Sequence, residues 1–419
     1  MEEGRTTRPA TAAALAGIRI CDFSGQLAGA GATKWLAAFG AEVIRIEDPT
    51  RDGRWDILRG VGPFVDERRG INLGGGFNTH NTEKLGVTIN VHSARGKEMV
   101  AELIRQSDCV TENFAAGVLE RWGFGYEALK AIRPDIIYVS NCGFGHVGPY
   151  KAYKTWGPIV QAVSGLTFSS GLAGQPPAGW GYSYMDHTGG YYMVMAILLA
   201  LLHRRRTGEG QWVDLACTEA GLSLNGPALL DWTVNNRPSR REGEPDSNRS
   251  ASPPMAPHGI HACAGNDGWI AIACRDDGDW RRLAAAIGEP WTLEGAYDTL
   301  EGRLENHAAL DARIGAWTAG RDKFDIQRQL RAAGIPCAAV QTPEERIEHD
   351  PDTLGLWPAV THTQIGEVRV DGLPARFSRT PWRIARGAPC LGEHNEAVFA
   401  RLLGLTSEEI AQLRAERVI

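Results

Sequence analysis

The segment Gly17–Ile46, GIRICDFSGQLAGAGATKWLAAFGAEVIRI, predicts a strand, a helix and a second strand in close succession. Gly17–Phe23 and Glu42–Ile46 are short runs of residues that favour strands, and Lys34–Gly40 between them has a helical pattern. Two strands joined through a helix in this way lie parallel in one sheet. The segment therefore predicts an α/β fold with a parallel sheet.

Small residues fill the connection between the first strand and the helix. Gly29-Ala30-Gly31 matches part of the dinucleotide fingerprint, and Glu47 falls near the position that would bind a ribose. Lys34 occupies the place of the third glycine, so the match is incomplete. Close packing of helix on strand is the simpler interpretation, and an NAD-dependent oxidoreductase is kept as an outside alternative.

Predicted strands and helices continue to alternate through the first half of the chain. They are Leu85–Asn90, Ser93–Gln106, Cys109–Asn113, Gly117–Gly123, Glu127–Ile132 and Asp135–Asn141. This alternation is typical of doubly wound sheets, in which ligands bind beyond the carboxyl ends of the strands. Asn113-Phe114 and Cys142-Gly143 fall at such ends.

The second half of the chain changes in character. We expect a flexible tail at 1–15, a Rossmann-like large domain at 16–234 and a polar linker at 235–252. A smaller α+β domain should occupy 253–345, with a hairpin followed by helices. Residues 346–419 should cross back and complete the large domain.

A second informative segment, Gly179–Cys217, reads GWGYSYMDHTGGYYMVMAILLALLHRRRTGEGQWVDLAC. Its centre, Tyr191–Leu202, is a continuous apolar run, shorter than the ~20 residues that span a bilayer. We expect a buried helix that ends near Gly208, which can adopt a left-handed cap, and then a strand at Gln211–Ala216.

Asp186 precedes this apolar run and has two interpretations. It could be an N-cap that accepts a backbone N–H, or a carboxylate kept ionised by the helix dipole beside Gly189 and Gly190. Aromatic residues crowd this position, either as core packing or as a pocket for a bulky acyl group; they are Trp180, Tyr182, Tyr184, Tyr191 and Tyr192.

Composition narrows the possible functions. The 419 residues include 43% hydrophobic and 22% charged residues, as in ordinary globular proteins, and the net charge of -6 argues against a nucleic-acid partner. Eight scattered cysteines without a CxxC pair indicate reduced thiols in a cytoplasm, with neither a disulfide framework nor a metal site. The amino-terminal residues do not resemble a signal peptide, and we expect no membrane association.

A series of motifs gives the chain a family resemblance. The motifs are GAEVIRIE at Gly40–Glu47, NTEKLGVTIN at Asn81–Asn90, ENFAAGVLERWGFGYEAL at Glu112–Leu129, GFGHVGPY at Gly143–Tyr150, TGEGQ at Thr207–Gln211 and LGEHNE at Leu391–Glu396. In order and spacing they resemble the family III CoA-transferases, which include formyl-CoA and carnitine CoA-transferases. The resemblance runs from Gly17 to the carboxyl terminus.

The resemblance implies that Asp186 is a nucleophile. A carboxylate would attack an acyl-CoA thioester to give a mixed anhydride, the CoA thiolate would return to form an aspartyl-CoA thioester, and a free carboxylic acid would then accept CoA. Coenzyme A is thus a substrate, and no tightly bound cofactor is expected. The family also implies a homodimer of two interlocked rings.

Further residues enter through the same resemblance. The implied CoA contacts are Lys84, Asn113, Phe114, Arg121 and Lys154. The implied substrate-pocket residues are Gln26, Leu27, Trp156, Tyr184, His187 and Gly189.

The sequence differs from that of formyl-CoA transferase in three features. Leu27 replaces a glutamine beside the reacting groups, with Gln26 one residue earlier, and Asp48 replaces an arginine. A glycine-rich loop of the small domain is missing near Ser252–Gly259. We therefore do not expect formyl-CoA and oxalate as substrates, and the groups that stabilise the oxyanion stay open.

The α-methylacyl-CoA racemases also resemble this chain and provide an alternative function. A racemase needs two bases, and Trp156 stands where these enzymes carry a catalytic histidine. His187 is the one nearby residue that keeps this alternative open.

Overall fold

The computed structural model describes residues 13–419, which form two compact units. The large unit comprises the described part of Met1–Ser169 with Ala178–Pro238 and Gly355–Ile419, and the small unit comprises Ser170–Pro177 and Ser239–Leu354. Most of the expected tail, residues 1–12, lies outside the described residues. Leu15, at its end, donates its backbone N–H to the carbonyl of Phe39 at 3.0 Å and packs on the core of the large unit.

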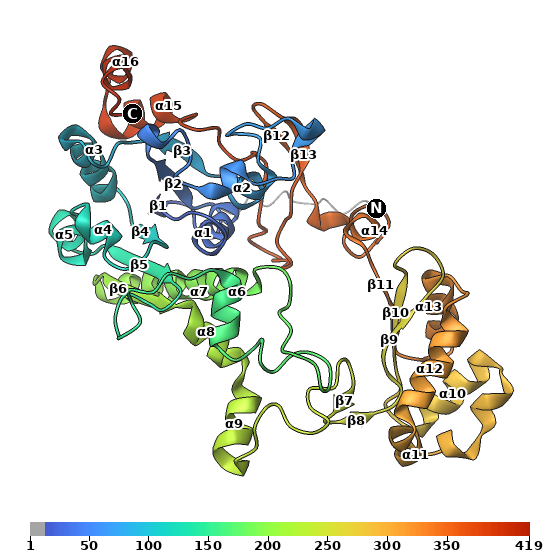
Figure 1. The fold of residues 1–419 in the computed structure, drawn as a ribbon. Coiled ribbons are helices and arrows are strands. Elements are labelled where there is room, and N and C mark those ends of the chain that lie inside the picture. Colours follow the sequence, from blue (N-terminus) through green and yellow to red (C-terminus); the bar gives the residue numbers. More distant parts are fainter. Residues whose placement is uncertain (1–12) are drawn as a thin grey trace, which may run out of the picture. The chain divides into compact units, whose positions relative to one another are not determined.

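A six-stranded sheet in the order β3-β2-β1-β4-β5-β6 organises the large unit, and every neighbouring pair of strands is parallel (Figure 1). Its strands are β1 (Arg19–Asp22), β2 (Glu42–Glu47), β3 (Leu85–Thr88), β4 (Cys109–Glu112), β5 (Ile137–Cys142) and β6 (Gln211–Ala216). The prediction of an α/β fold with a parallel sheet is confirmed. The strand order reverses between β1 and β4, which is where ligands bind in such sheets.

Helices bury both faces of this sheet. Neighbouring residues along each strand point to opposite faces, so they pack in different hydrophobic clusters. Ile20 packs with one cluster and Cys21 with the other, and Val139 and Tyr138 divide in the same way. One face is covered by α1 (Ala28–Ala38) and α7 (Tyr184–Thr207), the other by α3 (Ala94–Arg105), α5 (Tyr126–Ile132), α15 (Asn395–Val398) and α16 (Ser407–Ala415). The remaining helices of the large unit are α2 (Gly75–His80), α4 (Val118–Arg121), α6 (Gly157–Val163), α8 (Cys217–Leu224) and α9 (Gly226–Asn235).

The small residues after β1 serve close packing. Helix α1 begins at Ala28, six residues earlier than predicted, and a Cβ placed on Gly29 would lie 2.3 Å from the Cβ of Ser24. Glu47 is buried and bonds to Arg59 at 2.6 Å, so its carboxylate is not free for a ribose. Both findings favour the packing interpretation over the dinucleotide one.

Helix α7 is only half buried, which corrects the prediction of a fully buried helix. Met193, Ile197 and Ala200 pack on the sheet, whereas Met195 and Leu199 are 48% and 66% exposed. Among the described residues, α7 is the one helix long and apolar enough to cross a membrane, and 39% of its most apolar window is buried. Core helices of soluble proteins pass this test too, so it is weak support for a membrane span.

The segment after β6 forms two helices, α8 and α9, rather than one. The break falls at Asn225, just before Gly226 and Pro227. Proline lacks an N–H and disfavours a helical conformation in the residue before it, but it fits the first turn of a new helix. A helix boundary here follows directly from the sequence.

The small unit has its own sheet and core. Strands β9 (His258–Ala262), β10 (Trp269–Ala273) and β11 (Cys337–Val340) are antiparallel in the order β11-β10-β9. Helices pack on this sheet around Trp280, Leu283 and Leu330. These helices are α10 (Asp277–Ile287), α11 (Leu300–Glu305), α12 (His307–Thr318) and α13 (Lys323–Ala332), with α14 (Pro343–Glu348) after β11.

Short elements complete the chain. They are the β7–β8 hairpin (Ser250–Ala251, Pro254–Met255), the β12–β13 hairpin (Ala359–His362, Gly366–Arg369) and a π-helical turn at Phe399–Leu403.

The final segment of the chain is built into the amino-terminal half of the large unit. The side-chain amide of Asn395 bonds to the backbone N–H and the hydroxyl of Thr88, both at 2.8 Å. The N–H of Asn90 donates to the carbonyl of Val418 at 2.7 Å. All eight cysteines are free, and six of them are buried.

Candidate active site

Asp186 lies in the first turn of α7. The helix begins at Tyr184 with Ser183 as N-cap residue, so the interpretation of Asp186 as an N-cap is wrong. Its carboxylate accepts hydrogen bonds from the Ser183 side chain and from the backbone N–H of Gly157. A Cβ on Gly157 would lie 2.7 Å from Oδ2 of Asp186, so only glycine lets the start of α6 approach so closely.

Burial dominates the electrostatics of Asp186. It raises the pKa of the carboxyl above its ordinary value, and the hydrogen bonds from Ser183 and Gly157 only partly oppose it. Asp186 forms no ion pair with any described residue. The expectation that the helix dipole governs its ionisation therefore needs correction. A carboxylate of raised pKa is a stronger base when it is ionised, which suits a nucleophile.

Protein atoms fill the space beside Gly189 and Gly190, the two glycines that follow Asp186. A Cβ on Gly189 would lie 2.5 Å from the Sγ of Cys217, and a Cβ on Gly190 would lie 2.8 Å from the carbonyl oxygen of Ala28. They allow α7 to pack on α8 and α1, and both are buried. The structure therefore gives Gly189 a packing role, where a place in an open substrate pocket was expected.

The turn before α1 lies against this part of α7. It contains Gln26, which is exposed and left-handed at φ 54°, and Leu27, which is half-buried. Asn113 fixes the turn by accepting from the N–H of Gly25 at 2.7 Å and donating to its carbonyl at 2.8 Å. No side chain caps α1, so the unpaired N–H groups of its first turn are left to other partners.

Lys84 does not fit the expected role of a phosphate ligand. Its side chain is completely buried, and its Nζ donates to Asp22, to the carbonyl of Ala30 and to Asn81 at 3.3, 2.8 and 2.9 Å. These bonds use all three ammonium protons. Burial lowers its pKa to about 8 despite the nearby Asp22 carboxylate. The structure makes Lys84 an internal partner of the β1–α1 connection.

The other implied CoA contacts are more accessible. The Phe114 ring packs on Trp55 and Trp122, with centroids 5.5 and 5.1 Å apart. Arg121 and Lys154 are exposed cations. The side-chain amide of Asn113 forms hydrogen bonds with the backbone of Gly25. Contacts of these residues with CoA stay a prediction.

The aromatic residues around Asp186 are largely exposed in the single chain. Trp156, the N-cap residue of α6, is 58% exposed, and Tyr184 is 47% exposed with its ring 5.0 Å from that of Trp180. Tyr182 and Tyr191 are also exposed. Simple core packing does not account for these residues.

His187 belongs to a histidine pair that the sequence did not predict. Its ring centroid lies 5.4 Å from that of Tyr182 and 5.6 Å from that of His80. Burial lowers the pKa of both histidines, that of His80 to about 4, so neutral rings face each other. The Nδ1–H of His80 donates to the carbonyl of Gly76 at 2.9 Å. His80 stands directly before the NTEK motif, and this position is the one feature of the sequence that could have indicated a place near the site.

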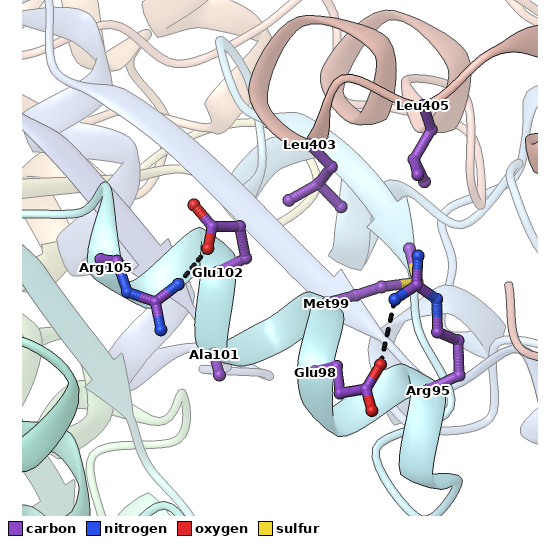
Figure 2. A pocket seen from close by; sticks show the side chains of 8 residues that line it. All are labelled: Arg95, Glu98, Met99, Ala101, Glu102, Arg105, Leu403 and Leu405. Carbon is purple, nitrogen blue, oxygen red and sulfur yellow. Dashed lines mark hydrogen bonds and ion pairs between the residues drawn. The ribbon is translucent and has the colours of Figure 1, made fainter.

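A groove of about 390 Å³ lies elsewhere on the large unit, between α3 and the turn before α16 (Figure 2). Met99, Leu403 and Leu405 provide its apolar lining. The rim carries two ion pairs, Arg95–Glu98 at 3.0 Å and Arg105–Glu102. None of the implied site residues lines it, so it is not the candidate active site.

No group of three or more possible metal ligands occurs in residues 13–419.

Comparisons with known proteins identify the family of the chain. The family model for CoA-transferase family III matches residues 15–395. The chain is 32% identical to succinyl-CoA–D-citramalate CoA-transferase of Chloroflexus aurantiacus, with 100% of both chains covered. It is 34% identical to formyl-CoA:oxalate CoA-transferase of Streptomyces coelicolor, over 98% of this chain and 100% of the relative.

A solved structure gives the same result for the fold. A CAIB/BAIF family protein from Brucella suis superposes with a TM-score of 0.83 at 29% identity, covering 94% of this chain and 100% of that one. Its likeness extends over both units of the chain described here. The family model and these relatives show that this chain belongs to the family III CoA-transferases and is an enzyme of that kind.

Proposed function

We propose that the enzyme moves CoA from an acyl-CoA to a free carboxylic acid, with Asp186 as the covalent carrier. The observation that supports this most is the state of Asp186, a half-buried carboxylate of raised pKa without an ion-pair partner among the described residues. A carboxylate with a structural role would be paired or capped. Asp186 instead has two neutral donors and a glycine beside its Oδ2.

The proposed reaction balances at every step. An oxygen of Asp186 attacks the thioester carbonyl, the C–S bond breaks, and a mixed anhydride and CoA thiolate result. The thiolate attacks Cγ of Asp186 and releases the donor acid. The acceptor carboxylate attacks the aspartyl thioester and expels the thiolate, which then attacks the acceptor acyl carbon and frees Asp186.

The donors around Asp186 have a role in these steps. The Gly157 N–H and the Ser183 side chain bond to the resting carboxylate. In the proposed mechanism they also bond to the oxygen that remains on Cγ when it is attacked, where negative charge develops. Preorganised donors of this kind stabilise a transition state more than the ground state.

The acids named for the relatives suggest the acceptor class. Citramalate and oxalate, the acceptor acids in these names, both carry two carboxyl groups. We propose a short dicarboxylic acid other than oxalate. Asp48 supports the exclusion of oxalate: it is buried, and it places a carboxylate where formyl-CoA transferase has an arginine, so it provides no cation for a second carboxylate.

Racemisation is a weaker candidate. The Trp156 indole is only a hydrogen-bond donor, and burial lowers the pKa of His187. The two curated relatives named above are both CoA-transferases.

We also propose that the enzyme is a cytoplasmic homodimer with the interlocked arrangement that the family resemblance implies. Apolar residues exposed on α6 to α9 support association of two chains; they are Ile159, Val163, Met195, Leu198, Leu199, Leu222, Leu229, Leu230 and Trp232. Light scattering at micromolar concentration should give twice the mass of one chain. A mass near 45.5 kDa would contradict the dimer.

Covalent trapping tests the mechanism directly. Enzyme incubated with succinyl-CoA and then with hydroxylamine should carry a hydroxamate on Asp186, detected by peptide mass spectrometry. Enzyme without acyl-CoA serves as the control. Unmodified Asp186 after turnover of a confirmed donor would contradict the proposal.

A further inference from the structure

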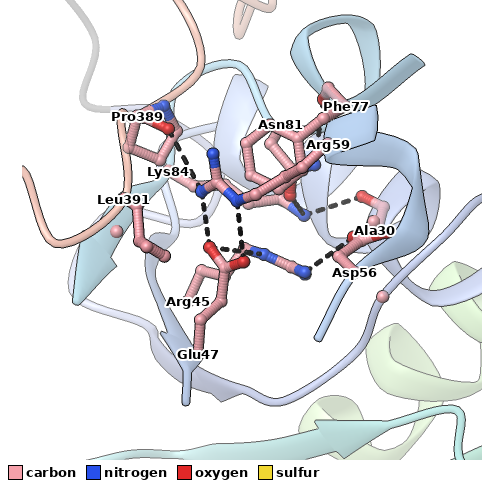
Figure 3. Close-up of polar contacts among 12 residues, drawn as sticks. Ala30, Arg45, Glu47, Asp56, Arg59, Phe77, Asn81, Lys84, Pro389 and Leu391 are labelled. Carbon is pink, nitrogen blue, oxygen red and sulfur yellow. Dashed lines mark hydrogen bonds and ion pairs between the residues drawn. The ribbon is translucent and has the colours of Figure 1, made fainter. Parts of the chain in front are cut away.

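We infer that Asp56, held by Arg45, is a positioning residue for the transfer reaction, because it fixes the Ser24–Leu27 turn beside the Asp186 helix. Both residues are completely buried, and neither belongs to the implied site residues. The inference rests on the function proposed above. Figure 3 shows the charged network around the two side chains.

Asp56 binds the turn through one oxygen. Its Oδ2 accepts the backbone N–H of Gln26 at 3.1 Å and Nη2 of Arg45 at 2.8 Å, while Oδ1 caps Leu58 at 3.0 Å. Oδ2 also lies 3.5 Å from where a Cβ on Gly25 would be. A charged acceptor therefore holds the centre of the turn.

Arg45 holds the same turn from the other side. Its Nη1 donates to the carbonyl of Ser24, and its Nη2 to Asp56. The guanidinium also lies 3.7 Å from Glu47 and 5.3 Å from the centroid of the Phe77 ring. The guanidinium therefore has little freedom to move. One ion pair, Arg45–Asp56, fixes both the carbonyl of Ser24 at the start of the turn and the N–H of Gln26 within it.

The conformation of the turn explains why such a clamp is needed. Gln26 adopts φ 54°, a left-handed conformation that side-chain-bearing residues seldom occupy and that must be maintained by the surroundings. Asn113 bonds only Gly25, the residue before it. Asp56 provides the bond to the strained residue itself.

The turn is coupled to the Asp186 helix by direct packing. It continues into α1 at Ala28, whose carbonyl oxygen would lie 2.8 Å from a Cβ on Gly190, four residues after Asp186. A change of the turn therefore moves Gln26, Leu27 and the start of α1 relative to Asp186. Small misplacements of this kind reduce rates without preventing binding.

A pair of variants tests the inference. Asp56→Asn keeps the shape of the side chain but removes the charge that holds Arg45 and the Gln26 N–H. Glu47→Gln is the matched control: Glu47 is equally buried and pairs with Arg59 and Arg45, yet makes no bond to the turn. For each variant, thermal unfolding, kcat and KM for succinyl-CoA, and the rate of hydroxamate formation on Asp186 are measured.

We expect both variants to lower the unfolding temperature, and only Asp56→Asn to lower kcat, by about 10- to 100-fold. Its KM should change by less than about threefold, because a misplaced reacting group affects the transition state more than binding. Arg45→Lys should also lower kcat, since lysine cannot hold Ser24 and Asp56 with two parallel donors.

The outcomes separate this inference from the proposed function. Wild-type kcat in Asp56→Asn, or equal losses of kcat in Asp56→Asn and Glu47→Gln, would overturn the positioning role. Absence of the Asp186 hydroxamate in the wild-type enzyme would instead overturn the covalent mechanism. A selective loss of kcat in Asp56→Asn would then still support positioning by the turn.

Discussion

Asp186 and Asp22 are two aspartates of the large unit with opposite environments. Asp22 is completely buried and accepts from the backbone and hydroxyl of Ser24, from Thr33, from Thr111 and from Lys84. Burial alone would raise its pKa, but Lys84, Arg45 and the hydroxyl donors outweigh burial and lower it. Asp186 has two neutral donors, no described ion pair and a raised pKa.

The difference indicates how one chain divides structural and chemical roles between identical side chains. A carboxylate bound by a cation and several donors is stabilised as an anion and is a poor nucleophile. A carboxylate with few donors retains its basicity for the reaction. We therefore expect changes at Asp186 to affect activity, and changes around Asp22 to affect stability.

The largest expected effect is at Asp186. Asp186→Ala should lower the transfer rate by more than about 10³-fold, because positioning cannot replace the covalent step. Calorimetric titration should still detect CoA binding, and the unfolding temperature should change little. Retention of more than a few per cent of the wild-type rate would show that another group carries CoA.

At Lys84 we expect the reverse, a large loss of stability as the main effect of substitution. Lys84→Met leaves Asp22 buried without its cation, which should lower the free energy of unfolding by about 3–5 kcal/mol. Lys154→Met, at an exposed cation, should change it by less than about 0.5 kcal/mol. Urea unfolding measures both values. A raised KM for acyl-CoA in Lys84→Met with unchanged stability would instead make Lys84 a ligand of CoA.

Glu112 is an intermediate case, buried but without a cation. Its pKa is raised to about 8, chiefly by burial and also by Glu120 and Asp214, although the Phe114 N–H and the Tyr138 hydroxyl donate to it. His146, whose Nε2 lies 3.3 Å from its Oε1, also faces it. The folded state therefore binds a proton that the unfolded state, with a pKa of about 4.3, releases.

The sign of the pH dependence follows from this difference. The stabilisation is complete below about pH 4, decreases as the pH rises and is lost once the pH has passed about 8. Glu112→Gln removes the titrating group, so its free energy of unfolding should fall less than that of the wild type between pH 5 and about 8.5. Urea titrations across this range compare the two slopes. Parallel curves would refute a raised pKa at Glu112.

The smallest effect is expected at His187, next to the nucleophile. His187→Gln should leave CoA transfer within about tenfold of wild type, since it removes at most one hydrogen bond. We also expect no deuterium at the α-carbon of a 2-methylacyl-CoA incubated with enzyme in heavy water. Stereospecific incorporation that His187→Gln abolishes would establish a racemase and overturn the transferase function.

The fold was largely predictable from local patterns. The runs GIRICDF and EVIRI alternate with helical segments, and the observed strands β1 and β2 fall within or beside the predicted ranges. The helix predicted at Ser93–Gln106 is observed as α3, and the Ser93 side chain caps it by accepting the N–H of Gly96. Such features depend on residues close in sequence.

The site was less predictable because its environment comes from distant residues. The burial of Lys84 depends on Asp22, which lies 62 positions earlier, and the clamp on Gln26 depends on Asp56 and Arg45. Helix α7 also begins two residues before Asp186, at Tyr184. A sequence pattern specifies residue types, but pKa and accessibility depend on what the fold places around them.

The return of the carboxyl terminus to the large unit has a consequence for biosynthesis. Thr88 and Asn90 bond to Asn395 and Val418, so the edge of the sheet at β3 is completed by residues that are translated after the small unit. While the ribosome synthesises the small unit, the amino-terminal half must wait with this edge unfinished. Emergence of this late segment, rather than of the first half, therefore sets the moment at which the large unit can close, and the unfinished edge is a site that chaperones can protect.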